Sequence, residues 1–356
     1  LYSEAEQELS NFAKKHNIPV TSTVMGIGCM TKDDPYYIST VGALGEGSSN
    51  NLSKDTDLAL AVGTKLADFT TGSWANFENP NFKLVSVNTT RYDTTKHLAT
   101  PVISDAKVGL QKISEALGDW KAPDPWYQRA IKERAKWDAY VEKQSGPTNQ
   151  EEPSYAHAVG AIYRNSDPSD IVVTAAGGLV GEVVQVWKPK QLNTFETEWG
   201  FSCMGYEISG ALGIKMAKPD QDVVVFVGDG SYLLQNSDIY SSVLYDKKLI
   251  IVVCDNGGHM VINRLQLAKG GKEYLCNLNA AGATNLQFVD FEAHAKSMGA
   301  NAETVKSTSE LEAAFKRAKA SDKTYVISMK TDGYEWLEGT AFWDSPTLQV
   351  SSTKEN

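Results

Sequence analysis

The fold is decided by the stretch Val223-Val224-Val225-Phe226-Val227-Gly228-Asp229-Gly230-Ser231. Its five consecutive apolar residues, four of them β-branched, predict a strand that is buried on both faces, as in a parallel sheet. Helix-compatible sequence follows from Asn236 to Tyr245, and a second apolar strand, Leu249 to Cys254, ends in Asp255-Asn256-Gly257-Gly258. This strand–helix–strand order predicts a parallel α/β arrangement.

Oxygen-bearing residues follow both strands. Asp229 comes directly after the first strand and Asn256, 27 residues later, directly after the second. The carboxyl ends of parallel strands share one edge of the sheet, which is where open α/β sheets bind ligands. Mg²⁺ takes oxygen ligands, with few carboxylates and the rest from carbonyls, water and phosphates. Asp229, the Asn256 amide oxygen and the Gly258 carbonyl therefore predict a magnesium site completed by phosphate oxygens.

The glycines of the same motif favour a bound phosphate. Gly228 and Gly230 allow the backbone to come close to an anion, and the amides of Gly230 and Ser231, at the start of a helical segment, can donate to it. No GxGxxG follows a strand in this chain, which disfavours a dinucleotide site.

The rest of the chain shows the same alternation of short apolar runs and helical patterns, so the predicted fold class is α/β with two parallel-sheet domains. We expect one domain over residues 1–118, a linker over 119–153, a second domain over 154–333 and a C-terminal tail over 334–356. The expected strands are Pro19–Val24, Leu58–Val62, Lys83–Val87 and Pro101–Ser104, then Ile171–Ala175, Val223–Val227, Leu249–Asp255 and Tyr325–Lys330, with early helices at Tyr2–His16 and Lys107–Leu117.

Bulk properties narrow the function classes. With 34 basic and 44 acidic residues the net charge is −10, and the basic residues are scattered, which argues against nucleic acid or an anionic membrane as a partner. The four cysteines have neither metal-type spacing nor disulfide density, so a reducing cytoplasm is expected. The chain begins at Leu1 with a helical pattern and no preceding strand, so we expect a fragment that lacks the first strand of its first domain.

The motif Gly228-Asp229-Gly230 with Asn256 resembles that of the thiamine-diphosphate enzymes of the acetolactate synthase and pyruvate decarboxylase superfamily. Gly200-Phe201-Ser202-Cys203-Met204-Gly205-Tyr206-Glu207 resembles the segment that holds the cofactor's aminopyrimidine ring. The resemblance implies that Met204 keeps the cofactor bent and that the backbone of Ser202 and Met204 meets the pyrimidine. Without that likeness, Met204 would be read as a core methionine. Gly181 lies in a segment that resembles a family stretch near the diphosphate.

Within this superfamily the whole chain is similar to the trihydroxycyclohexanedione hydrolases of myo-inositol catabolism. The stretches that carry the likeness are Val62–Thr71, Phe201–Glu207, Asp255–Gly258 with Val261–Gln266, and Trp343-Asp344. The resemblance implies a Rossmann-like central domain followed by the diphosphate- and Mg²⁺-binding domain. It implies hydrolytic cleavage of a carbon–carbon bond between the adjacent carbonyls of a cyclic diketone, giving a deoxy-glucuronic acid.

The family also has a preceding pyrimidine-binding domain, which supplies a catalytic glutamate across a subunit interface. We therefore expect a homodimer or dimer of dimers, in which that domain completes the site. No residue of this chain takes the role of that glutamate, so the fragment alone is expected to be inactive, and the water-activating base is not identified.

Three positions depart from the family pattern. Val184 and Glu196 stand where histidine is expected, and His259 stands where phenylalanine is common. His259 is either a packing or surface histidine or an acid–base group. A carboligase or 2-oxoacid decarboxylase, or a cofactor-binding fragment without catalysis, remains an alternative function.

Overall fold

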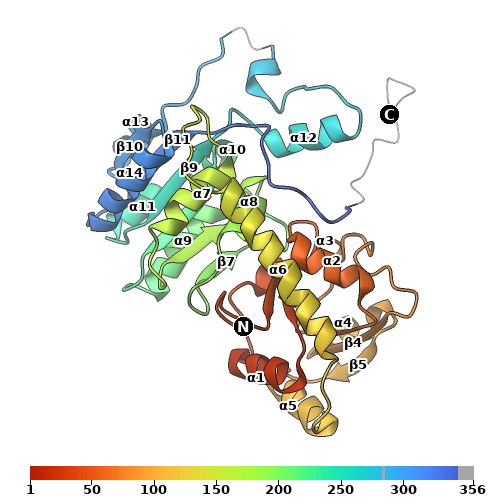
Figure 1. Cartoon of the computed structure of the whole chain (residues 1–356). Coiled ribbons are helices and arrows are strands. Elements are labelled where there is room, and N and C mark those ends of the chain that lie inside the picture. Colours follow the sequence, from red (N-terminus) through yellow and green to blue (C-terminus); the bar gives the residue numbers. More distant parts are fainter. Residues whose placement is uncertain (283–284, 344–356) are drawn as a thin grey trace. The chain divides into compact units, whose positions relative to one another are not determined.

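The computed structural model describes residues 1–282 and 285–343, which form two compact units (Figure 1). The first unit comprises Leu1–Tyr140, Lys188–Asn193 and residues 338–343, and the second comprises Val141–Trp187 and Thr194–Leu337. The residues of the expected linker, 119–153, are divided between the two units, and the expected domain bounds stay a prediction. Asp344 and the rest of the expected tail, 344–356, lie outside the described residues.

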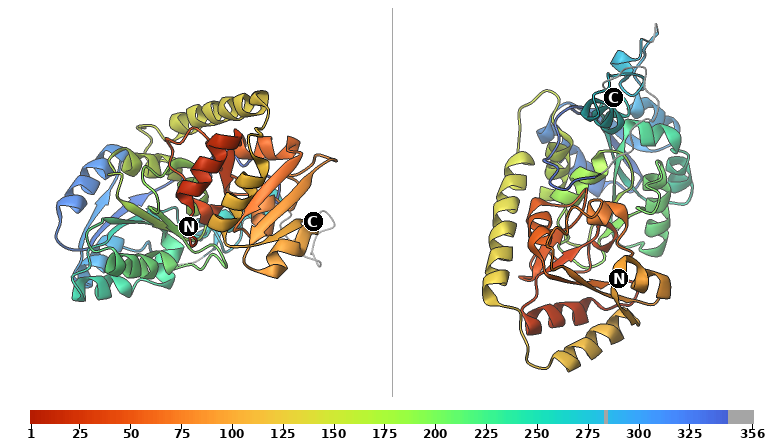
Figure 2. Two further views of the ribbon diagram at one scale, coloured as in Figure 1. Left: turned by 90° about the horizontal axis from the view of Figure 1, so that it is seen from below. Right: turned by 90° about the vertical axis from the view of Figure 1, so that its right-hand side faces the viewer.

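The first unit contains parallel strands and covering helices. β1 (Val20–Ser22) pairs with β2 (Tyr37–Thr40), and a second sheet has the order β3-β4-β5. All four expected strands are present, whereas β2 was not predicted because half of its residues are polar. Its Ser39 is buried and exchanges hydrogen bonds with Ser48 and Ser49. The other elements are β3 (Leu58–Val62), β4 (Lys83–Asn88), β5 (Thr100–Ile103), α1 (Glu6–His16), α2 (Gly47–Asp55), α3 (Asp68–Thr71), α4 (Arg91–Thr95), α5 (Ala106–Leu117) and α6 (Asp124–Gln144), the long yellow helix of Figure 2.

The second unit is built on one sheet of six parallel strands in the order β10-β11-β9-β8-β6-β7. The four expected strands are present, and the short outer strands β7 and β10 were not predicted. The strands are β6 (Ile171–Thr174), β7 (Phe195–Thr197), β8 (Val223–Gly228), β9 (Ile250–Asp255), β10 (Asn301–Val305) and β11 (Tyr325–Lys330).

Helices cover both faces of this sheet. In β8, Val223, Val225 and Val227 face the core shared with α9, α11 and α13, and every residue from Val223 to Val227 is fully buried. The opposite face is covered by α7, α8 and α14. The prediction of a strand buried on both faces is therefore confirmed. The helices are α7 (Tyr155–Arg164), α8 (Leu179–Val186), α9 (Tyr206–Ala217), α10 (Asp229–Leu234), α11 (Asp238–Leu244), α12 (Met260–Ala268), α13 (Phe291–Ser297) and α14 (Thr308–Ala320).

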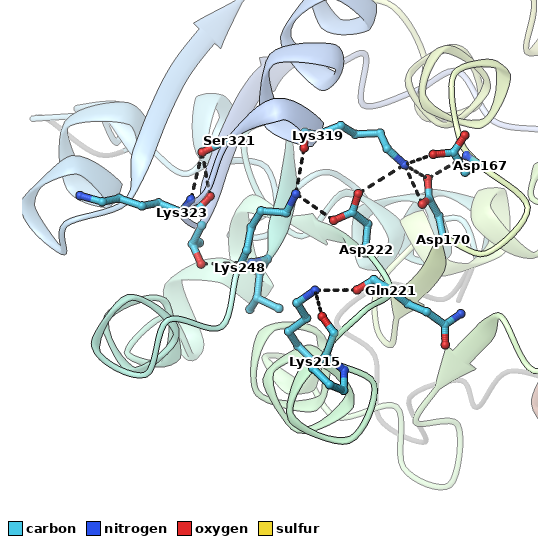
Figure 3. A network of polar contacts seen from close by, with 12 residues as sticks. Asp167, Asp170, Lys215, Gln221, Asp222, Lys248, Lys319, Ser321 and Lys323 are labelled. Atoms are coloured by element: carbon cyan, nitrogen blue, oxygen red, sulfur yellow. Dashed lines mark hydrogen bonds and ion pairs between the residues drawn. The ribbon is translucent and has the colours of Figure 1, made fainter.

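A network of ion pairs holds the amino-terminal edge of the six-stranded sheet (Figure 3). The ammonium group of Lys319 lies 2.7 Å from Asp167 and from Asp170 and 3.4 Å from Asp222, which also pairs with Lys248 at 2.8 Å. Asp170 and Asp222 directly precede β6 and β8. Charged side chains at this edge therefore stabilise the strand starts and leave the carboxyl edge for a ligand.

The carboxyl edge contains the point where the strand order reverses. From β6 the chain passes to β7 on one side, then returns to β8 and β9 on the other. Ligands of open α/β sheets bind in the crevice at such a point. No helix of the described residues is long and apolar enough to cross a membrane.

Candidate cofactor and metal site

The motif at residues 228–231 forms an abrupt strand-to-helix turn. β8 ends at Gly228 and α10 begins at Asp229, with no loop between them. Asp229 is 5% exposed, and Gly230 and Ser231 lie in the first turn of the helix. The amides of a first helical turn have no partner within the helix and can bind an anion. In this turn the Gly230 amide lies near the Asp229 carboxylate and lowers its pKa.

The loop after β9 meets this turn. The amide of Gly258 lies near the carboxylate of Asp229 and lowers its pKa. Strands β8 and β9 are adjacent, with Gly228 opposite Cys254, so the residues that follow them emerge side by side. The structure thus brings together the loops that carry Asp229, Asn256 and Gly258.

Electrostatics single out Asp229 at this edge. Burial, and next the like charge of Asp255, raise the pKa of Asp229 to about 7, against the opposing effect of the Gly258 amide. Asp255, unlike Asp229, has a basic partner, because its carboxylate pairs with Lys330; it also accepts a hydrogen bond from the Gly257 amide at 3.0 Å. Over residues 1–282 and 285–343, no basic side chain forms an ion pair with Asp229. A cation beside Asp229 would compensate its charge.

Two further oxygens are available for such a cation. The side-chain oxygen of Asn256 is buried and accepts no hydrogen bond from the described residues. Gly258 and Asn277 form an antiparallel β-bridge, in which the His259 amide donates to the Cys276 carbonyl and the Leu278 amide donates to the Gly257 carbonyl. Neither hydrogen bond uses the Gly258 carbonyl. In the described part of the chain, no group of three or more His, Cys, Asp and Glu could hold a metal. One carboxylate, one amide and one carbonyl fit Mg²⁺, which completes its shell with phosphate oxygens and water.

Gly258 adopts a backbone conformation that side chains disfavour. Its φ is +144°, and an added Cβ would lie 2.3 Å from the carbonyl oxygen of Cys276. Glycine is therefore required for the loop after β9 to pack against the segment around Cys276.

The segment from Phe201 to Glu207 lies beside the turn at residues 228–231. Ser202, with φ +53°, donates its hydroxyl to the carbonyl of Ala175 at 3.0 Å, just beyond β6. Met204 is half-buried, and an added Cβ on Gly230 would lie 3.4 Å from its terminal methyl carbon. Met204 thus lies next to the expected phosphate-binding backbone, which is compatible with its proposed contact with the cofactor.

Gly181 occupies a different position. It is buried in the first turn of α8, and its amide donates to the carbonyl of Gly178 at 3.1 Å. Its neighbour Glu182 is buried and accepts the amide of Leu337 at 3.2 Å, while burial raises the Glu182 pKa to about 8. A contact between Gly181 and the diphosphate stays a prediction.

The three departures from the family pattern are placed differently. Val184 is 1% exposed within α8, and Glu196 is an exposed residue of β7. His259 is exposed, but its ring lies against Gly230, where an added Cβ would be 2.6 Å from the ring. Both readings of His259 therefore stay open.

Two carboxylates that sequence reasoning did not single out shape the Phe201–Glu207 segment. Glu207 is fully buried and accepts the amides of Ala176 and Gly205. Glu198 accepts the amides of Phe201 and Cys203 at 2.9 and 2.8 Å. The only available signal was an acidic residue followed by apolar positions in Tyr206-Glu207-Ile208, which is also common at exposed helix starts.

Comparison with known proteins agrees with this geometry. The family model described as "Thiamine pyrophosphate enzyme, central domain" matches residues 1–113, and "Thiamine pyrophosphate enzyme, C-terminal TPP binding domain" matches residues 175–329. The chain is also similar to proteins named 3D-(3,5/4)-trihydroxycyclohexane-1,2-dione hydrolase. That of Geobacillus thermodenitrificans is 30% identical, with 100% of this chain and 60% of the relative covered. That of Bacillus licheniformis is 33% identical, with 96% of this chain and 58% of the relative covered.

The chain spans about 60% of the length of the curated relatives that it matches. The two matched domains follow one another along the chain in the order central, then cofactor-binding, and the second contains Asp229, Asn256 and Gly258. The chain belongs to the thiamine pyrophosphate enzymes, of which it carries the central domain and the C-terminal cofactor-binding domain.

Proposed function

We propose that the protein with this chain is a thiamine-pyrophosphate-dependent hydrolase that opens the ring of a polyhydroxylated cyclohexane-1,2-dione in myo-inositol catabolism. The observation that carries the proposal is the match to relatives named as such hydrolases, at 30–33% identity over 96–100% of this chain. The reaction breaks the carbon–carbon bond between the two carbonyl groups. Water contributes a hydroxyl group to the carbon that becomes the carboxylic acid and a proton to the other carbon, so a single open-chain deoxy-glucuronic acid forms.

The chain's own residues are proposed to hold the diphosphate end of the cofactor. Asp229, the Asn256 side chain and the Gly258 carbonyl would bind Mg²⁺, whose charge offsets both the diphosphate and the buried Asp229 carboxylate. The amides of Gly230 and Ser231 would donate to phosphate oxygens, and Gly228 keeps the turn open for them. Gly181 would approach the diphosphate from α8.

When bound, thiamine pyrophosphate supplies the nucleophilic carbon for cleavage next to a carbonyl group. The protein orients that carbon and excludes competing reactions. Met204 would support the cofactor from below, and the backbone of Ser202 and Met204 would position its pyrimidine ring. The hydroxyl bond from Ser202 to Ala175 fixes this segment to the end of β6.

The remaining proposals concern the oligomeric state and the cellular compartment of the protein. We propose that the protein works in the cytoplasm as a homodimer or dimer of dimers. A pyrimidine-binding domain of a neighbouring subunit would complete the site and supply the glutamate that acts on the pyrimidine. The partner of the active site is a small cyclic diketone, and neither nucleic acid nor a membrane is expected to bind.

Substrate turnover tests the function. The purified full-length protein, with its pyrimidine-binding domain, thiamine pyrophosphate and Mg²⁺, should convert the trihydroxycyclohexanedione to an acid, which can be monitored by proton release. Asp229→Ala should abolish the reaction. Pyruvate should not be consumed. Turnover of pyruvate with no turnover of the diketone would favour a carboligase or decarboxylase instead.

A further inference from the structure

We infer that Glu207 is a positioning residue that fixes three backbone segments of the cofactor site with one buried carboxylate. The inference deepens the proposed function and rests on the cofactor site described there. It assigns Glu207 no contact with the cofactor.

Each oxygen of Glu207 has a defined partner. Oε1 accepts the amide of Ala176 at 3.2 Å, and Oε2 accepts the amide of Gly205 at 2.8 Å. The hydroxyl of Ser231 lies near the same carboxylate and lowers its pKa. The three partners come from the loop after β6, the segment before α9 and the first turn of α10.

These partners flank the residues proposed to meet the cofactor. Gly205 follows Met204, and Ser231 follows Gly230, so Glu207 holds the chain one residue beyond each member of this pair. Met204 and Gly230 are close, with 3.4 Å between the terminal methyl carbon of Met204 and a Cβ added to Gly230. Glu207 therefore sets the separation between the side chain proposed to bend the cofactor and the backbone proposed to bind its diphosphate.

The third partner extends the same control to Ser202. Ala176 follows Ala175, whose carbonyl accepts the hydroxyl of Ser202 at 3.0 Å. The Ala176 amide is in turn fixed by Glu207. The carboxylate of Glu207 thus fixes, through neighbouring residues, the three segments that carry Ser202, Met204 and Gly230.

Only an acceptor with two oxygens satisfies this arrangement. An ionised carboxylate accepts through both oxygens, whereas glutamine places a donating NH₂ group against a backbone N–H. Burying a carboxylate is costly unless hydrogen bonds compensate it, and Glu207 is fully buried. The two amide donors, the Ser231 hydroxyl and the place of Glu207 in the first turn of α9 offset part of that cost, although burial remains the largest effect and raises the pKa of Glu207.

A matched control separates positioning from general stability. Asp170 is also a buried carboxylate of the second unit, but it lies at the opposite edge of the sheet, bound to Lys319 (Figure 3). Asp170→Asn removes a charged group from an ion-pair network without touching the cofactor site. It should lower the melting temperature and leave cofactor binding intact.

The experiment is calorimetric titration of thiamine pyrophosphate, at saturating Mg²⁺, into the purified full-length protein, with its pyrimidine-binding domain, and into its variants. Because each lost charged hydrogen bond is worth roughly a tenfold change in affinity, Glu207→Gln should raise the Kd about tenfold and Glu207→Ala about 100-fold. Asp170→Asn should stay within about twofold of the unsubstituted protein. The partial rescue by glutamine relative to alanine is the readout that a purely structural role would not produce. If Glu207→Ala does not fold, Glu207→Gln decides alone.

Equal Kd values for Glu207→Gln and the unsubstituted protein would overturn the inference, as would equal weakening by Asp170→Asn. If the unsubstituted protein itself fails to bind thiamine pyrophosphate, the proposed function is wrong and the inference falls with it. If the unsubstituted protein binds thiamine pyrophosphate and Glu207→Gln binds it equally well, only the inference about Glu207 is wrong and the proposed function stands.

Discussion

The amide of Gly258 lies near the carboxylate of Asp229 and lowers its pKa, so the loops that follow two neighbouring strands meet at this carboxylate. The pairing of Gly228 with Cys254 in the parallel ladder of β8 and β9 sets how these loops emerge. The position of the proposed metal ligands is therefore a property of the sheet register, and changes in the loops should affect cofactor binding before they affect the fold.

Gly258→Ala should disrupt the loop after β9. The added Cβ would lie 2.3 Å from the Cys276 carbonyl oxygen, in a backbone conformation that costs roughly 1–3 kcal/mol for other residues. Magnesium-dependent binding of thiamine pyrophosphate, measured by calorimetry, should weaken at least about tenfold. Gly213→Ala is the control, because it lies within α9 with open space around it and should stabilise the helix by about 0.5–1 kcal/mol. Equal cofactor affinities in both variants would argue against a structured loop after β9.

Met204→Ala should lower turnover far more than stability. Met204 is only half-buried, so its truncation should cost less than the roughly 2–5 kcal/mol of a core methionine. Met30, 2% exposed in the first unit, provides that comparison. Met30→Ala should lower the free energy of unfolding in urea and preserve turnover per folded molecule. The reverse pattern, with stability lost in Met204→Ala and normal turnover, would identify Met204 as an ordinary packing residue.

Glu182 should make stability depend on pH. Burial raises its pKa from 4.5 in the unfolded chain to about 8 in the folded protein. Between these values the folded state keeps a proton that the unfolded state has lost, so the contribution of Glu182 to stability is complete below pH 4.5 and is lost as pH rises to about 8. Glu182→Gln cannot titrate and retains an oxygen for the Leu337 amide.

The measurement is the free energy of unfolding of both proteins between about pH 5 and 8, which is roughly the interval between the two pKa values. The advantage of Glu182→Gln over the unsubstituted protein should grow with pH, by at most about 1.4 kcal/mol per unit. Parallel stability curves would show that Glu182 is not held protonated in the fold.

The sequence predicted the central strands because burial on both faces leaves an unmistakable apolar run. Val223–Val227 and Ile250–Cys254 are found in β8 and β9 as expected, and the proposed metal ligands directly follow these two strands. The short strands β2, β7 and β10 escaped prediction, since Tyr37–Thr40, Phe195–Thr197 and Asn301–Val305 mix polar and apolar residues. Their strand conformation depends on pairing with a neighbouring strand rather than on a local pattern.

The polar supports of the site could not be predicted for a similar reason. Asp229, Asn256 and Gly258 can be recognised in the sequence because oxygen-bearing residues and glycines directly follow two apolar strands. The role of Glu207 instead depends on amides from Ala176 and Gly205, which have no side-chain signature in the sequence. The ion pair that compensates Asp255 and leaves Asp229 for a cation likewise appears only when β11 lies beside β9.

The most direct test of the central claim is calorimetric titration of thiamine pyrophosphate, with and without Mg²⁺, into the purified full-length protein and into its Asp229→Ala variant. The unsubstituted protein should bind the cofactor in a magnesium-dependent manner. Asp229→Ala should weaken that binding by about 100-fold or more, equivalent to roughly 2.7 kcal/mol, and remove most of the magnesium dependence. Unchanged affinity of Asp229→Ala at limiting Mg²⁺ would contradict the account.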